Sequence, residues 1–403
     1  MASLKQGGHM ITTSYYSSSR YSTSNNGYDG VVRIASNGSV GTGALLYDGR
    51  AVLTAAHLLD GVSSAEVTFL INGVKTRVSS SDYLLHPSAD TTAANNDLAI
   101  LWLDSTPITA ERYQIYRDSD EIGQTFTMAG FGQYGEGASA TRYNGSDSVR
   151  YKAQNTFDVT GDEFKQGLGS EISWTPASGT QLLADFDNGS AANDAFGMLL
   201  GVNDLGLGAD EGLIAPGDSG GSAFIDGVIA GVASYTASVS TWWADTDIDE
   251  VTNSSFGELA AWQRVSHYQR WIDQSVREHY DSAPESPAEV QLEVVEGDSG
   301  SSYAYFMVSF NGDRGMADDI ISVDYQTRDG SATAGEDYLA LSGTLNIYDD
   351  ESYALIAVEV LGDQTVEDDE AFYLDITNPL GGSFGDGVVT LTAMRTILND
   401  DLI

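Results

Sequence analysis

Short runs of apolar residues, each ended by glycine or another turn-forming residue, fill the chain from Val31 to about Ile248. Runs of this kind predict short β-strands joined by turns. They lie at residues 31–36, 42–47, 51–56, 65–70, 98–103 and 125–132. Two polar stretches, residues 12–30 and 133–215, lack this pattern, and we expect an arm or loop in the first and large loops in the second.

A helix is expected further along, and the strands resume after it. Apolar residues recur at the period of an amphipathic helix at Ala261, Val265, Tyr268, Ile272 and Val276. Residues 281–288 are polar and hold two prolines, which indicates a linker. Beyond the linker, about seven apolar runs between residues 290 and 394 predict a β-sandwich in which each strand buries one face.

These patterns predict an all-β fold in two domains. We place the first domain at residues 11–280, the linker at 281–288 and the second domain at 289–403. Residues 1–10 (MASLKQGGHM) resemble the remnant of an expression tag and are left out of the fold prediction.

Acidic residues dominate the charge of the chain. The 403 residues include 59 Asp and Glu but 18 Lys and Arg, which gives a formal net charge of -41. Such a chain lacks the basic surface that nucleic acids and anionic membranes require, so neither is expected as a partner. No apolar run is long enough to insert into a membrane. The absence of cysteine excludes disulfides, thiolate nucleophiles and Cys-bound zinc.

Three short segments carry residues that together can perform nucleophilic catalysis. They are Thr54-Ala55-Ala56-His57, Asn95-Asn96-Asp97-Leu98-Ala99-Ile100-Leu101 and Gly217-Asp218-Ser219-Gly220-Gly221. A serine hydroxyl is a weak nucleophile at neutral pH unless an imidazole takes its proton and a carboxylate orients that imidazole. We therefore predict Ser219 as nucleophile, His57 as base and Asp97 as the orienting acid. The N–H groups of Gly217 and Ser219 are predicted to hold the oxyanion.

The order His, Asp, Ser with these flanking residues resembles the trypsin-like (chymotrypsin-family) serine proteases. Further matching segments are His86-Pro87-Ser88, Gly130-Phe131-Gly132, Ala233-Ser234-Tyr235 and WQRVSHYQRWI at 262–272. The resemblance covers roughly residues 30–277. It implies a double six-stranded antiparallel β-barrel with a C-terminal helix, and a triad in the cleft between the barrels.

Two other segments resemble parts of these motifs, and we exclude both from the catalytic site. His86 also precedes Asp97, but it lies outside the Thr-Ala-Ala-His motif. Gly297-Asp298-Ser299-Gly300 lacks the second glycine and the strand and helix that follow the nucleophile in this family, so we expect a turn there.

One family feature is missing from the sequence. In the family, a newly cut amino terminus that starts Ile/Val-Val/Ile-Gly-Gly pairs with the acid before the nucleophile, here Asp218. No such start precedes the first predicted barrel, so the partner of Asp218 stays open. A precursor, another terminus and a chain that needs no cleavage are the alternatives.

The resemblance also assigns residues that bind substrate. Ser234 and Tyr235 fall on the strand, Ala233-Ser234-Tyr235, that pairs with the substrate backbone. Leu213 falls at the base of the primary pocket, and Thr236 and Ala260 fall at its walls. A Leu base offers no carboxylate to an Arg or Lys side chain, and these walls narrow the pocket. We expect cleavage after small or medium apolar residues. The alternative is a pocket influenced by the nearby acids Asp245, Asp247, Asp249 and Glu250.

Residues 289–403 resemble a Calx-beta domain. Matching segments are Val294-Val295-Glu296-Gly297, Ala334-Gly335-Glu336-Asp337-Tyr338, residues 362–370 and Ile397-Leu398-Asn399-Asp400-Asp401. The family implies an immunoglobulin-like sandwich that binds calcium at one end. The ligand candidates are Glu296, Asp337, Asp363, Glu367 and Asp400, and Asp401 could join them. Gly362 and Asn399 stand where acids are common in calcium-binding members, so an acidic end without an ion is the alternative.

A second acidic segment lies in the first domain. It reads Asp185-Phe186-Asp187-Asn188-Gly189, and Asn193 and Asp194 follow. Short acids that alternate before a glycine can wrap calcium, but the Glu that closes an EF-hand loop is absent. We expect a plain turn here, with a calcium loop as the alternative.

These motifs together predict a monomeric serine endopeptidase of protein or peptide substrates. We expect it to be secreted, at the cell surface or periplasmic, to need no cofactor for catalysis, and to bind calcium in its C-terminal domain. The alternative is a catalytically idle trypsin-like protein that acts as a calcium-dependent binding or adhesion module. The acidic, cysteine-free composition favours a bacterial source.

Overall fold

A computed structural model describes residues 10–15, 17, 22, 23, 27–105, 109–139, 142, 143, 145–311 and 320–401. The chain is mostly β, as the sequence predicts. It divides into two compact units, and the division falls after Gln269, inside helix α4 (Val265–Glu278). The predicted domain boundaries at residues 280 and 289 stay a prediction.

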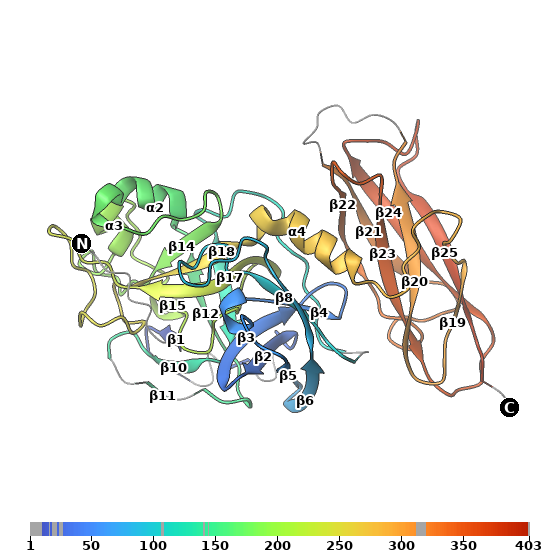
Figure 1. Ribbon diagram of the computed structural model, residues 1–403, viewed down its shortest axis with the longest axis horizontal. Helices are drawn as coiled ribbons and strands as arrows, with labels where there is room; N and C mark the ends of the chain where they lie inside the picture. Colours follow the sequence, from blue (N-terminus) through green and yellow to red (C-terminus); the bar gives the residue numbers. More distant parts are fainter. Residues whose placement is uncertain are drawn as a thin grey trace. The chain divides into compact units, whose positions relative to one another are not determined.

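Two curled half-barrel sheets form most of unit 1 (Figure 1). The first, in the order β6-β5-β2-β3-β4-β8-β7, consists of β2 (Val31–Ser36), β3 (Ser39–Leu45), β4 (Ala51–Thr54), β5 (Ala65–Ile71), β6 (Val74–Ser80), β7 (Asp82–Leu85) and β8 (Ala99–Trp102). The second, in the order β12-β9-β16-β17-β18-β14-β13, consists of β9 (Thr125–Gly130), β12 (Tyr151–Thr156), β13 (Val159–Thr160), β14 (Gln181–Asp185), β16 (Ser222–Ile225), β17 (Val228–Ala237) and β18 (Leu259–Arg264). The double-barrel class is confirmed, with seven described strands in each sheet where the resemblance implied six.

A smaller sheet involves the segment near the amino terminus. Its order is β11-β10-β1-β15, with β1 (Met10–Thr13), β10 (Gln133–Glu136), β11 (Arg142–Tyr143) and β15 (Gly212–Leu213). We predicted an arm or loop from residue 12, but Thr12 and Thr13 are buried in β1, which runs parallel to β10 and antiparallel to β15. The strand depends on these distant partners rather than on its own periodicity.

The polar stretch 133–215 is more regular than predicted. Besides strands, it holds α2 (Gly161–Leu168), α3 (Ala195–Leu200) and the short 3-10 turns η2 (Gly169–Glu171) and η3 (Gly208–Asp210). A capping box starts α2, because Thr160 accepts the backbone N–H of Glu163 while the Glu163 carboxylate accepts the N–H of Thr160. The large-loop prediction is therefore wrong for these segments.

The predicted C-terminal helix is present but shorter at its start. Ala261 lies in β18, where it pairs with Leu183 of β14 and Tyr235 of β17, and α4 begins at Val265. The apolar residues before Val265 fit a strand buried on both faces as well as a helix, which is why periodicity alone misplaced the boundary.

Unit 2 is a β-sandwich-like domain. A five-stranded sheet, in the order β19-β25-β24-β21-β22, contains β19 (Glu293–Val295), β21 (Ile321–Asp329), β22 (Ser342–Ile347), β24 (Glu370–Leu380) and β25 (Leu391–Leu398). A second pair joins β20 (Gly300–Ser309) to β23 (Tyr353–Gly362). Their shared core includes Tyr338 stacked on Phe372 at 4.5 Å between ring centroids.

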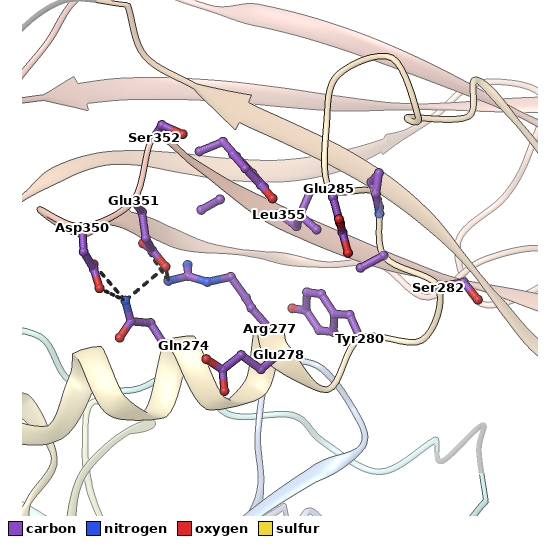
Figure 2. A pocket seen from close by; sticks show the side chains of 14 residues that line it. Gln274, Arg277, Glu278, Tyr280, Ser282, Glu285, Asp350, Glu351, Ser352 and Leu355 are labelled. Carbon is purple, nitrogen blue, oxygen red and sulfur yellow. Dashed lines mark hydrogen bonds and ion pairs between the residues drawn. The ribbon is translucent and has the colours of Figure 1, made fainter.

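The part of α4 that belongs to unit 2 is anchored by polar contacts (Figure 2). Arg277 pairs with Glu351 at 3.0 Å, and Gln274 donates to Asp350 at 3.0 Å. Arg277 also donates to the Asn346 carbonyl at 3.0 Å. Asn346 lies in β22, and Asp350 and Glu351 lie on the loop after it, so these contacts fix the end of β22 and that loop to the helix.

Candidate active site

Strand pairing brings His57 and Asp97 together. His57 follows β4 in the 3-10 turn η1 (Ala56–Leu58), and Asp97 lies two residues before β8. Because β4 and β8 pair antiparallel with Thr54 opposite Ala99, the two flanking residues meet at the same sheet end. The His57 Nδ1 lies 2.7 Å from Asp97 Oδ2, and the His57 backbone N–H donates to Oδ1 at 2.9 Å. Asp97 therefore holds His57 by two contacts, one to its ring and one to its backbone.

Ser234, which the sequence analysis assigned to substrate binding, also contacts Asp97. The Ser234 hydroxyl donates to Asp97 Oδ2 at 2.6 Å. The register between β17 and β18 shifts between Ala233 and Tyr235, so Ser234 sits at a bulge, a feature that redirects side chains. Sequence reasoning missed this contact, since a bulge depends on the register of two distant strands.

The charge of Asp97 is stabilised in its buried position. Its side chain is 1% exposed, and such burial favours the neutral acid. Hydrogen bonds from the His57 ring, Ser234 and the His57 backbone outweigh burial and hold the pKa of Asp97 below its ordinary value. Asp97 is thus an anion at neutral pH and can accept the hydrogen bond that orients the His57 ring.

The turn that carries Ser219 packs against the same sheet end. The Ser219 carbonyl accepts the N–H of Thr42 at 2.8 Å. Gly220, with φ of +79°, leaves no room for a Cβ, which would collide with Thr54 Oγ1. The turn therefore lies against the residues just before His57. Among the described residues, none accepts a hydrogen bond from the backbone N–H of Gly217 or Ser219, so both amides are available to an oxyanion.

Backbone amides supply the partners of Asp218. Its carboxylate accepts the N–H of Gly132 at 2.9 Å, that of Ala215 at 3.1 Å, and that of Ile11 in β1. A Cβ on Gly132 would collide with this carboxylate, which explains the Gly-aromatic-Gly segment. Burial raises the pKa of Asp218 to about 8 despite these three bonds. Ile11 directly follows the segment that resembles a tag remnant, and whether the chain needs cleavage before it is active stays open.

The predicted pocket residues are all buried. Thr236 of β17 stands directly opposite Ala260 of β18, and Leu213 lies in β15. Tyr235 points to the other side of its strand, where its hydroxyl donates to Gln181 at 2.9 Å and its ring contacts Trp174. The side chain of Tyr235 therefore serves packing, and a role in substrate binding is left to its backbone.

The competing histidine has a different environment. The ring of His86 lies 5.1 Å from that of Tyr268, edge to face. Burial, with a smaller effect of His267, lowers the pKa of His86. These contacts place His86 against Tyr268, and its exclusion as the base stays a prediction.

The acidic end of unit 2 brings several predicted calcium ligands together. Oxygens of Asp337, Glu367 and Glu370 lie within 4.8 Å of one another. Burial and the charges of Asp363, Glu367, Asp401 and Asp337 raise the pKa of Glu296 to about 7. Asp400 lies close by but accepts the Gly297 N–H at 2.9 Å. Sequence reasoning missed Glu370, although it closes the acidic run 367–370.

Comparison with known protein families gives two matches on separate parts of the chain. The Trypsin family model matches residues 18–212, a range that includes His57 and Asp97 and ends before Ser219. The Calx-beta domain model matches residues 288–401. The two matches agree with the two resemblances read from the sequence.

Curated relatives match over short stretches. The sodium/calcium exchanger Calx of Drosophila melanogaster is 35% identical over 91 residues, which are 22% of this chain and 9% of the exchanger. Sodium/calcium exchanger 2 of Homo sapiens and of Rattus norvegicus is 37% identical over 92 residues, 20% of this chain and 10% of the exchanger. The chain thus spans about a tenth of the length of these relatives. No helix in the described part of the chain has both the length and the apolar character needed to cross a membrane.

Proposed function

The chain belongs to the trypsin family over residues 18–212 and carries a Calx-beta domain over residues 288–401, and we propose that it is a serine endopeptidase with Ser219 as nucleophile. The observation that carries this proposal is the His57–Asp97 pair at 2.7 Å beside the Ser219 turn. A structural histidine would not need a buried carboxylate held ionised by three donors.

The proposed reaction is acyl transfer. The Ser219 hydroxyl attacks the peptide carbonyl while His57 Nε2 takes its proton, and the new oxyanion receives the N–H groups of Gly217 and Ser219. Asp97 keeps the Nδ1 proton of His57 in place and stabilises the imidazolium. His57 then protonates the leaving amine, and water releases the acyl group by the reverse sequence.

Substrates with a small or medium apolar residue before the scissile bond are expected to react fastest. Leu213 and Ala260 offer no partner to a charged side chain, so kcat/KM for Ala or Val should exceed that for Arg by about 100-fold or more. A panel of fluorogenic peptides that differ at this residue measures the preference. The Thr236→Gly variant should widen the pocket and favour larger apolar residues, whereas preferred cleavage after Arg in the unaltered protein would refute the assignment.

One observation favours the idle binding protein as a second candidate. Asp218 accepts backbone amides rather than an ammonium group, and the family uses that ammonium to order the oxyanion loop. If the oxyanion loop needs that ammonium group, a chain that has not been cut is inactive even when its catalytic triad is complete. Labelling of the nucleophile, taken up in the Discussion, separates the two candidates.

We also propose that unit 2 binds calcium through Asp337, Glu367 and Glu370, with Glu296 nearby. The separation of at most 4.8 Å between their oxygens fits ligands about 2.4 Å from one ion, and Asp401 has a buried oxygen without a hydrogen-bond partner among the described residues. Such a domain suits locations outside the cytoplasm, where calcium is abundant, and secretion is therefore part of the proposal.

Calcium is expected to bind unit 2 about tenfold more weakly near pH 6 than near pH 8. Burial and neighbouring acids raise the pKa of Glu296 and Glu370 to about 7, so protons compete for the ligand oxygens below that pH. In the metal-free protein, the folded state holds these protons while the unfolded state releases them. Stability should therefore fall as pH rises from about 4.5 through 7, and calcium should reverse this fall. Titration calorimetry and thermal melting in chelator measure both trends, and a pH-independent affinity would contradict the ligand assignment.

A further inference from the structure

The interior of unit 1 holds carboxylates that the proposed reaction does not use. Asp185 ends β14, Asp187 follows two residues later, and Asp194 precedes α3. One carboxylate oxygen from each lies within 4.8 Å of the other two. Each residue is 2% exposed. These three residues are called the interior carboxylate cluster below.

Further acids rather than bases surround this cluster. Glu211, 1% exposed, accepts the N–H of Asp187 at 2.7 Å, and Asp158 accepts the N–H of Asp185 at 3.3 Å. Asp204 acts on Asp194 by charge. Among the described residues, no ion pair joins any of these acids to Lys, Arg or His. Any negative charge on these acids therefore has no counter-ion among the residues that the structure describes.

One buried carboxylate oxygen of the cluster has no hydrogen-bond partner among the described residues, which indicates that a ligand belongs beside it. Asp185 and Asp194 accept backbone N–H groups of α3, from Phe196 and Gly197 respectively. Asp187 Oδ1 is buried and accepts no hydrogen bond from any described residue. A plain turn would satisfy or expose this oxygen, because an unpaired buried carboxylate lowers stability.

We propose that the interior carboxylate cluster binds a calcium ion, with Asp185, Asp187 and Asp194 as ligands. Two oxygens on opposite sides of a calcium ion are about 4.8 Å apart, which is the limit that the three carboxylates keep. The donors are all oxygen, with neither His nor Cys, and this set selects a hard cation over zinc or copper. The site lies in the first domain and is separate from the acidic end of unit 2.

The alternative to a bound ion is protonation of the carboxylates. Burial and neighbouring acids raise the pKa of Asp185 to about 7 and that of Asp187 to about 10 when no ion is present. Protons would neutralise the acids but give Asp187 Oδ1 no partner. An ion would do both, and through the Glu211 contact with Asp187 it would steady the residue that leads directly into β15 and Leu213.

The test measures calcium binding to the full chain, with calcium alone as the probe. Equilibrium dialysis gives the number of ions per chain, and hydrogen exchange read by mass spectrometry locates them. Asp187→Asn removes a ligand from the interior cluster, and Asp337→Asn is the matched change in unit 2. Asp194→Asn is the second cluster variant, since Asn caps a helix as well as Asp and the start of α3 is kept.

The expected result separates the two sites. Calcium should slow exchange in peptides from 185–211 of the unaltered protein, and Asp187→Asn or Asp194→Asn should abolish this effect while peptides from 337–370 still respond. Each variant should weaken binding at the cluster by about 100-fold or more. In chelator, Asp187→Asn should melt no lower than the unaltered protein, because the raised pKa of about 10 already leaves Asp187 uncharged and Asn keeps this position uncharged. The same number of ions bound in the cluster variants, or no calcium effect in 185–211, would overturn the proposal and leave protons as the occupant.

Discussion

Replacing Ser219 by alanine is expected to lower kcat for peptide hydrolysis by about a million-fold. The change removes the attacking oxygen and leaves the His57–Asp97 contact at 2.7 Å and both oxyanion amides intact. Since these remaining groups still bind and polarise substrate, a residual rate about 10³–10⁴ above the uncatalysed reaction should persist. Single-turnover assays with the best peptide of the panel measure the loss.

A matched control lies in unit 2. Ser299 stands in Gly297-Asp298-Ser299-Gly300, the same local sequence without the second glycine. Ser299→Ala should leave peptide hydrolysis unchanged, because the sequence predicts no base and no orienting acid for Ser299. Activity that survives Ser219→Ala, or falls equally in Ser299→Ala, would refute the assignment of the nucleophile.

A chain cut so that it begins at Ile11 is expected to hydrolyse peptides about 10²–10³ times faster than the longer chain. The Ile11 nitrogen already donates to the Asp218 carboxylate. A free amino terminus at that nitrogen would be an ammonium, whose charge favours ionised Asp218 and a fixed oxyanion loop next to it. The expected increase in the rate of hydrolysis is the contribution of one correctly placed oxyanion-hole donor.

The pH dependence of stability provides a second readout of this change. In the longer chain, the folded state keeps a proton on Asp218 up to about pH 8, while the unfolded state loses it near its ordinary value. Stability should therefore fall as pH rises from about 4 through 8. The chain that begins at Ile11 should lose the part of this trend that comes from Asp218, and Asp218→Asn in that chain should cancel the gain in activity. Equal activity of the two chains would mean that no cleavage is needed.

Local sequence was sufficient for the pair at the centre of the site. The apolar runs at 51–56 and 98–103 correspond to β4 and β8, so the residues at their ends, His57 and Asp97, could be predicted to meet. The Ser219 turn could also be predicted, because its glycines occupy positions where a Cβ would collide or where φ is positive.

Contacts made by register and by distant segments could not be predicted in this way. The Ser234 hydroxyl reaches Asp97 through a bulge, and β1 forms because β10 and β15 accept it on either side. The sequence around Asp187 predicts an ordinary turn, because it does not show that Glu211 and Asp194 contact Asp187 in the folded chain. Burial, rather than composition, makes that segment unusual.

The central claim is that Ser219 is an activated nucleophile, and a fluorophosphonate probe tests it most directly. The full chain and the chain beginning at Ile11 would be treated with the probe, digested and read by mass spectrometry, with His57→Ala and His86→Ala as paired variants. The predicted result is a label on Ser219 that is strongest in the chain beginning at Ile11, disappears in His57→Ala and persists in His86→Ala. Absence of the label from both chains, or a label on Ser219 that survives His57→Ala, would contradict the claim and favour the idle binding protein.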